Sequence, residues 1–153
     1  MAGESSDLEF NGPFPDWWNV VDDFGADPTG TMNSTGAFQD MINAMVPGDL
    51  KNDTYNGVTG YIPSGTYLIG SLMMPPTCLP TEAIGINLWG QDPATTILKY
   101  IGSPGNNMIW MDGCHSSTIN RLTFDGQGVA DAGVRLERNA AISLQNTYSR
   151  LQD

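Results

Sequence analysis

The chain has 153 residues with a formal net charge of -11 at pH 7, and only 6 of its residues are Lys or Arg. This length suits one domain or part of one. So few cations exclude a phosphate-binding surface for nucleic acid or an anionic membrane, and no apolar run approaches the roughly 20 residues of a membrane-spanning helix.

The chain begins with MAGESSDLEF, which has neither the basic nor the apolar segment of a secretory signal. We interpret residues 1–18 as an N-terminal extension and residues 19–153 as the folded domain. Without a signal, we expect a protein that stays where it is made, one that leaves as part of a particle, or a sequence whose natural start is missing. A virion or extracellular location is favoured.

One short helix is predicted near the start, over the stretch STGAFQDMINAM at residues 34–45. Asn33 or Ser34 can cap its N-terminus, and the sequence VPGD ends it. Apolar side chains occur at helical spacing, and they are Ala37, Phe38, Met41, Ile42 and Met45. We expect this helix to cover the open end of a β-structure and to shield its first strand edges.

From Ile62 on, apolar residues recur about every 24 positions, and turn residues separate them. The first ladder contains Ile62, Ile86, Ile109 and Val134, with Leu88, Met111 and Leu136 two positions later. The second contains Leu98 and Leu122, with Tyr100, Phe124 and Tyr148 two positions later. Two alternating strands per period describe one coil of a parallel β-helix. A leucine-rich repeat has a similar period, but its motif is absent. The predicted fold is an all-β solenoid of about three to four coils.

Three stretches in this order resemble the start of the pectate-lyase-like right-handed parallel β-helix superfamily: NVVDDFGADPTGTMNSTGAFQDMINAM, GVTGYIPSGTYLIGSLMMP and INLWGQDPATTIL. The resemblance covers roughly residues 18–126. Members of that superfamily include polygalacturonases, exo-β-1,3-glucanases and phage tailspikes. The resemblance implies a right-handed β-helix with an N-terminal capping α-helix that binds or cleaves polysaccharide. The fold alone does not decide between these activities.

Few carboxylates are candidates for catalysis. The stretch TFDGQG at residues 123–128 resembles one that lies upstream of the catalytic region in polygalacturonases, whose downstream signatures have no counterpart here. Glycoside hydrolysis needs two carboxyl groups about 5–10 Å apart, and Asp112 and Asp125 are the best candidates. We expect them to end different strands of one coil, so that their side chains do not converge. An Asp before Gly is also an ordinary turn residue.

No cofactor and no metal site is expected. His115 is the only His, which excludes a multi-histidine metal site within the chain and disfavours a Ser-His-Asp triad. Cys78 and Cys114 can either form a disulfide or serve as small buried apolar residues.

Three acidic residues precede the predicted helix, namely Asp22, Asp23 and Asp27. They can be interpreted as oxygen ligands for Ca²⁺. Their spacing lacks the pattern of a dedicated calcium loop, so a solvated loop is the simpler interpretation.

The outward face of the predicted strands carries a candidate substrate-binding surface. Side chains alternate along a strand, so Asn87, Trp110 and Arg135 should form one outward column, with Trp89 beside it. An exposed indole flanked by an amide and a guanidinium suits a sugar ring. Alternatively, Trp110 packs under the N-terminal segment at residues 17–18, or against a second subunit.

The last stretch, RLERNAAISLQNTYSRLQD, predicts no second helix that would close the last coil. Asn146 also takes the inward position that Leu98 and Leu122 hold in earlier coils. We therefore expect a longer protein of which this is the front part, a homotrimer, or another protein that covers the end.

The leading functional hypothesis is a carbohydrate-binding or carbohydrate-processing β-helix module that is non-catalytic by itself. It would belong to a virion-associated spike or fibre, or to the front of a pectate-lyase-like enzyme, with a polysaccharide or cell-surface glycan as its partner. One alternative is an active polysaccharide hydrolase or lyase whose catalytic residues lie on later coils. Another is a structural assembly protein whose outward column is a protein interface.

Overall fold

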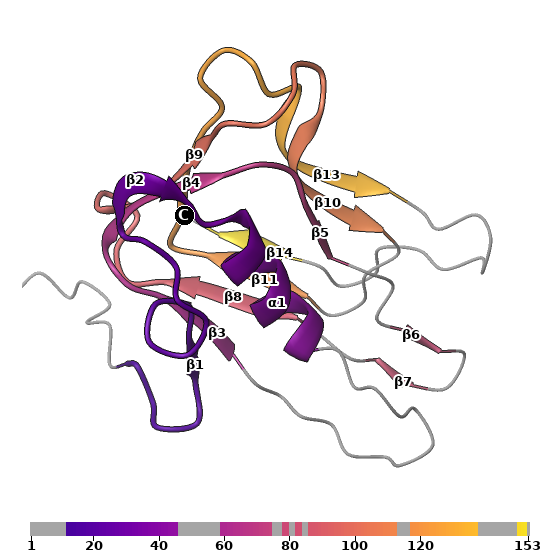
Figure 1. Cartoon of the computed structure of the whole chain (residues 1–153). Helices are drawn as coiled ribbons and strands as arrows, with labels where there is room; N and C mark the ends of the chain where they lie inside the picture. The colour runs from indigo at the N-terminus through magenta and orange to yellow at the C-terminus, as the bar shows by residue number, and fades with distance from the viewer. Residues whose placement is uncertain are drawn as a thin grey trace, which may run out of the picture.

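The computed structural model describes residues 12–45, 59–74, 86–112 and 117–137, together with short strands at 78–79, 82–83 and 150–152. The described part is mostly β-structure. It contains three parallel sheets, one small antiparallel pair of strands, and one helix, α1 (Thr35–Met45) (Figure 1).

The parallel strands fall into three sheets. Sheet 1 contains β1 (Trp18–Asn19), β3 (Thr59–Ile62), β8 (Asn87–Gly90), β11 (Thr118–Asn120) and β14 (Arg150–Gln152). Sheet 2 contains β2 (Thr29–Asn33), β4 (Gly65–Ile69), β9 (Thr96–Tyr100) and β12 (Thr123–Asp125). Sheet 3 contains β5 (Leu72–Met74), β10 (Asn107–Asp112) and β13 (Ala132–Glu137). The antiparallel pair is β6 (Cys78–Leu79) and β7 (Glu82–Ala83).

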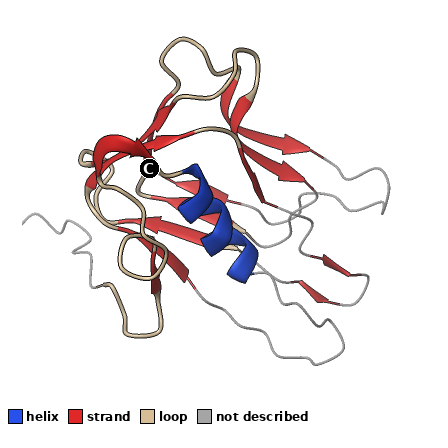
Figure 2. Cartoon of the chain, in the orientation of Figure 1, coloured by secondary structure: helices blue, strands red, loops and turns tan. Residues whose placement is uncertain are grey.

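From β3 to β13 the chain visits sheets 1, 2 and 3 in turn, and it does so repeatedly. Each strand pairs in parallel with the equivalent strand of the next passage, as β4 does with β9 and β9 with β12. Figure 2 shows these strands surrounding a common interior, with α1 lying against them. This is the arrangement of a parallel β-helix.

The predicted repeat is confirmed in part by the register of sheet 3. The aligned pairs of β10 and β13 include Ile109 with Val134 and Met111 with Leu136. The earlier members of that ladder were assigned wrongly. Ile62 lies opposite Gly90 in sheet 1, and Ile86 directly precedes β8 of the same sheet.

The second predicted ladder is wrong by two positions. Leu98 lies opposite Phe124 in sheet 2, not opposite Leu122. A shift of two keeps a side chain on the same face of the sheet, so the error left the inward and outward assignment intact. The predictions for Asn146 and Tyr148 lie outside the described residues.

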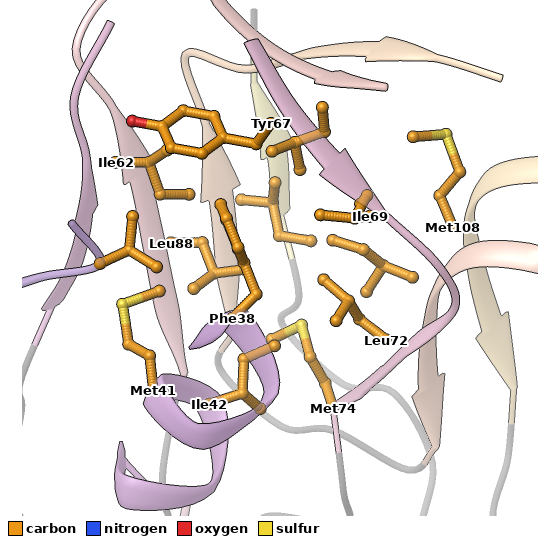
Figure 3. Packing of buried hydrophobic residues seen from close by; sticks show 14 of the residues in the cluster. Phe38, Met41, Ile42, Ile62, Tyr67, Ile69, Leu72, Met74, Leu88 and Met108 are labelled. Atoms are coloured by element: carbon orange, nitrogen blue, oxygen red, sulfur yellow. The ribbon is translucent and has the colours of Figure 1, made fainter. Parts of the chain in front are cut away.

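The interior between the sheets is filled by apolar side chains, ten of which are labelled in Figure 3. Inward residues such as Leu88, Leu98 and Met111 are fully buried. At β13 the interior becomes more open. Leu136 is 49% exposed although it is aligned with the buried Met111. The core is therefore less completely covered at β13, the last strand of sheet 3 that the structure describes.

The helix contributes an apolar face to the same core, as its spacing predicted. Its buried side chains are Phe38, Met41, Ile42 and Met45. The Phe38 ring meets the edge of the buried Tyr67 ring at a centroid distance of 5.3 Å. Burial also raises the pKa of Tyr67, whose hydroxyl donates to the Pro63 carbonyl at 2.8 Å.

Both predicted capping residues take part in the start of α1. The Ser34 carbonyl accepts the N–H of Phe38 at 3.1 Å, which makes Ser34 the N-cap position. The Oδ1 of Asn33 accepts the N–H of Thr35 at 2.9 Å. The N–H of Ser34 in turn donates to the Leu68 carbonyl on β4 at 2.8 Å, which ties the start of the helix to sheet 2.

The turns between sheets 1 and 2 stack closely on one another. Gln91 donates its N–H to the Ile62 carbonyl at 2.9 Å, and the Arg121 guanidinium donates to the Gln91 carbonyl through Nη2 at 2.7 Å. A Cβ at Gly90 would overlap the carbonyl oxygen of Arg121. The sequence therefore needs glycine here, because only its backbone allows this approach.

Candidate functional site

A cleft opens on the outer face of sheet 3, beside α1. Its volume is about 260 Å³. The described residues that line it are Gln39, Ser71, Leu72, Met73, Asn106, Asn107 and Trp110. Trp110 is 37% exposed and Met73 is 42% exposed. Two large apolar side chains thus remain accessible to a ligand at this site.

The strand register places Met73, Trp110 and Arg135 in one column across sheet 3. Met73 and Trp110 each lie between buried residues, so their side chains point away from the core, and the register places Arg135 on the same face. The predicted neighbours Trp110 and Arg135 are confirmed. The predicted third member, Asn87, is wrong, because Asn87 lies on β8 of sheet 1 opposite Thr118.

Trp89 also lies on sheet 1, and it belongs to an aromatic cluster rather than to the cleft. The Trp17 ring lies 5.8 Å from the Trp89 ring and 5.2 Å from the Phe14 ring, centroid to centroid. Tyr61 completes the cluster at 6.2 Å from Trp17. The N-terminal segment therefore covers Trp89, and the alternative that it covers Trp110 is not supported by these contacts.

The amide of Gln39 closes one side of the cleft and is already engaged. Its Nε2 donates to the Met73 carbonyl at 2.9 Å and to Asn43 Oδ1 at 3.0 Å. Its Oε1 accepts the Met73 N–H at 2.9 Å. Gln39 therefore fixes the shape of the cleft at the edge of β5.

The other polar groups of the lining come from Ser71, Asn106 and Asn107. The Ser71 hydroxyl lies 3.2 Å from the Tyr100 hydroxyl. Asn106 is exposed, so its side-chain amide offers donors and an acceptor to a ligand. The Oδ1 of Asn107 is buried and has no hydrogen-bond partner within the described part of the chain. The cleft thus combines an apolar floor with hydroxyl and amide groups.

The charged groups of sheet 3 lie outside this lining. The Nη2 of Arg135 lies 3.4 Å from Oε1 of Glu137, and both side chains are about half exposed. Asp112 is aligned with Glu137 on the neighbouring strand. The guanidinium next to Trp110 therefore already has a carboxylate partner, with a second acidic residue one strand away.

The two predicted catalytic candidates do not form a pair. Asp112 ends β10 in sheet 3, whereas Asp125 ends β12 in sheet 2, which belongs to the next passage and not to the same coil. The side chain of Gln127 donates to Asp125 at 2.5 Å and its N–H at 3.1 Å. These bonds lower the pKa of Asp125, which is the wrong direction for a general acid.

The three acidic residues before α1 accept hydrogen bonds within their own loop, and Asp22 accepts the side-chain amide of Asn19 at 2.7 Å. Asp27 accepts the N–H groups of Thr29, Thr31 and Met32 at 2.7–3.0 Å. Asp23 accepts the N–H of Asn19 at 2.7 Å. Across the ranges that the structure describes, no three metal-ligating His, Cys, Asp or Glu side chains gather in one place.

The predictions for His115, Cys114 and the C-terminal stretch after Glu137 fall outside the described residues, apart from β14. The strand that holds Cys78 is described, but its side chain is not. None of the helices that the structure describes is long and apolar enough to cross a membrane.

Sequence reasoning missed the residues that α1 and β5 contribute to the cleft. Met73 lies 37 positions before Trp110, far from the expected period of about 24, because residues 75–85 with the strands β6 and β7 intervene. The signal that could have indicated a longer coil is the Pro-rich stretch PPTCLP at residues 75–80.

The chain belongs to the family of rhamnogalacturonase A/epimerase, pectate lyase-like proteins, whose sequence profile matches residues 17–127. Among solved structures, it is similar to the ORF18 protein of Geobacillus virus E2, with 27% sequence identity and a TM-score of 0.62. The match covers 78% of this chain but only 23% of the viral protein. No curated protein sequence matches the chain.

Proposed function

We propose that the chain is a carbohydrate-binding β-helix module that is non-catalytic by itself. It forms a right-handed solenoid of three to four coils over residues 19–153, preceded by an extension at residues 1–18, and α1 caps its first coil. The observation that carries the binding function is the half-exposed Trp110 indole in a cleft that amide and hydroxyl groups surround.

The physical basis is the chemistry of a sugar ring, which has apolar C–H faces and a polar edge. A half-exposed indole is apolar on its faces and carries one N–H donor. Met73 extends the apolar surface on the neighbouring strand, and a thioether adapts readily to an irregular surface. Asn106 and Ser71 supply hydrogen-bonding groups for the hydroxyls at the edge.

The non-catalytic assignment follows from the carboxylates. A general acid must hold a proton near neutral pH, and this requires a raised pKa. Hydrogen bonds from Gln127 lower the pKa of Asp125 instead. Asp112 and Asp125 also lie on different sheets, so neither supplies the other with a partner across a sugar.

The biological setting proposed here is a spike or fibre of a virus particle, which recognises a polysaccharide or cell-surface glycan. The similarity to a viral protein supports this setting. The exposed inward residue Leu136 supports a further partner at β13. That partner is either a longer chain that continues the coils or two further copies in a homotrimer.

The family favours a second candidate function. Its name includes a rhamnogalacturonase and an epimerase, and the chain spans only 23% of the length of the similar viral protein. In this alternative the module is the front of an active polysaccharide hydrolase or lyase, with catalytic residues on later coils. A third candidate function is a purely structural role in assembly, in which the column of Met73, Trp110 and Arg135 is a protein interface.

Affinity electrophoresis through gels that contain polysaccharides tests the binding function. Trp110→Ala and Met73→Ala should lose the retardation that the unmodified chain shows in a gel with its ligand. Met32→Ala is the matched control, because Met32 is 68% exposed but lies on β2, away from the cleft. Retardation that survives Trp110→Ala would rule out the cleft. Release of reducing sugar by the purified chain would favour the enzyme.

A further inference from the structure

The described side chains that line the cleft bear no formal charge. Among the described residues, the lining consists of three amides, one hydroxyl and three apolar side chains. None of these groups ionises near neutral pH. Within the described part of the lining, a ligand therefore meets dipoles and apolar surface but no cation.

Recognition of an acidic sugar requires a cation for its carboxylate. Carboxylates in binding sites are held by charge-assisted hydrogen bonds, most effectively by an unencumbered Arg fork. Arg135 is the cation adjacent to Trp110 across the strands. Its guanidinium lies 3.4 Å from the Glu137 carboxylate, so a uronate in the cleft would have to compete with that carboxylate.

The charges near the column also add up unfavourably for an anion. Asp112 and Glu137 are aligned on β10 and β13, directly beside the aligned pair of Trp110 and Arg135. Among the described residues of these two strands, two carboxylates stand against one guanidinium. The whole chain has a formal net charge of -11, so the wider field repels an anionic polymer as well.

We infer that the cleft takes one ring of an uncharged polysaccharide, a neutral hexose or N-acetylhexosamine, and discriminates against polygalacturonate and other polyuronates. The inference rests on the proposed function, since it names the ligand class of the same cleft. A volume of about 260 Å³ is below the roughly 300–1,000 Å³ that encloses a drug-sized ligand, so it suits a single ring of a chain.

The neutral lining sets this site apart from the acidic substrate that the words pectate lyase-like imply in the name of the family. The Trp110 ring provides the stacking surface, and the Asn106 amide offers partners for hydroxyl or acetamido groups. Ionic strength should then have little effect on binding, because no ion pair forms between protein and ligand.

Isothermal titration calorimetry with two groups of hexasaccharides tests the inference. One group is neutral and contains the cello-, laminari- and chito-series; the other is oligogalacturonate. The unmodified chain should bind a neutral hexasaccharide at least about tenfold more tightly than oligogalacturonate, with an affinity that changes less than about twofold between low and high salt. Trp110→Ala should abolish this binding.

Glu137→Gln provides the matched charge variant. It removes the carboxylate partner of Arg135, so affinity for oligogalacturonate should rise several-fold while affinity for the neutral ligand stays within about twofold. Tight, salt-sensitive binding of oligogalacturonate that Trp110→Ala abolishes would overturn the neutral ligand class but leave the proposed function standing. Binding of neither group would overturn both.

Discussion

The side-chain amide of Gln39 pairs with both backbone groups of Met73, as a neighbouring strand would. The Met73 N–H donates to Oε1 and the Met73 carbonyl accepts from Nε2, each at 2.9 Å. Met73 lies on β5, which has β10 as its one neighbour among the described strands of sheet 3. The helix therefore closes the free edge of this sheet with a single side chain.

Replacing that amide should destabilise the fold. Gln39→Leu leaves the two backbone groups of Met73 without these partners, and we expect the free energy of unfolding to fall by about 1–3 kcal/mol. Asn43→Ala is the control, since it removes only the Gln39–Asn43 contact on the helix surface. Urea denaturation followed by circular dichroism measures both. Equal midpoints for the two variants would contradict the edge-closing role.

The close stacking of the turns gives a second prediction. Gly90→Ala places a Cβ against the Arg121 carbonyl oxygen and the Leu122 side chain, so the backbone must shift, and we expect a loss of about 1–3 kcal/mol or more. Gly36→Ala is the matched control, because its Cβ meets nothing within 4 Å and it lies in α1. That substitution should be neutral or stabilise by up to about 1 kcal/mol. Thermal denaturation measures both variants. A lower melting temperature for Gly36→Ala than for Gly90→Ala would contradict the role of Gly90 in the stacked turns.

Asp27 makes the stability depend on pH in a defined direction. Hydrogen bonds, led by the Thr29 hydroxyl at 2.6 Å, hold the pKa of Asp27 well below its ordinary value. An unfolded Asp titrates near about 3.9, so between the two pKa values the unfolded chain binds more protons. Stability from this group is therefore complete above about pH 4 and is lost as the pH falls toward the folded pKa.

The test is the melting temperature from about pH 2 to pH 7 for the unmodified chain and Asp27→Asn. The variant should melt lower at neutral pH, and the difference between the two should shrink as the pH falls below about 4. Thr31→Val, which removes one donor to the same carboxylate, should give an intermediate result. A difference that stays constant across the range would show that the charge of Asp27 has no part in the stability.

Two tryptophans of the same passage, Trp89 on β8 and Trp110 on β10, should differ in what their loss does to stability. Trp89 packs against Trp17 at a centroid distance of 5.8 Å, so Trp89→Ala should destabilise by about 2–4 kcal/mol. Trp110 is 37% exposed, so Trp110→Ala should cost less stability than Trp89→Ala, by about 1 kcal/mol or more. Chemical denaturation of both variants measures the difference. A comparably large loss from Trp110→Ala would indicate that Trp110 serves packing.

The parallel β-helix could be predicted because its signals are local. Alternation of apolar and polar residues marks the inward face of each strand, and turn residues mark the corners. The same reasoning gave the helix and its buried face from the spacing of Phe38, Met41 and Ile42. These features depend on neighbours within about one turn or one strand.

The candidate site could be predicted only where coils have nearly equal length. Trp110 and Arg135 were placed side by side correctly, since β10 and β13 lie 25 positions apart. The alternation of apolar and polar residues predicts that a side chain points outward, but it does not predict which of the three sheets the residue occupies. For this reason the predicted positions of Asn87 and Trp89 are wrong. Gln39 was missed because its contact with Met73 joins a helix to a strand edge 34 residues away.

We propose the Trp110 cleft as the sugar-binding site. Its most direct test is a titration of the ¹⁵N-labelled chain with a neutral hexasaccharide, followed through the indole N–H signals of its 4 Trp residues. Trp→Phe variants assign the signals. The Trp110 signal should shift progressively, while those of Trp17, Trp18 and Trp89 stay in place. A shift confined to Trp17 and Trp89, or saturable binding that moves no indole signal, would contradict the claim.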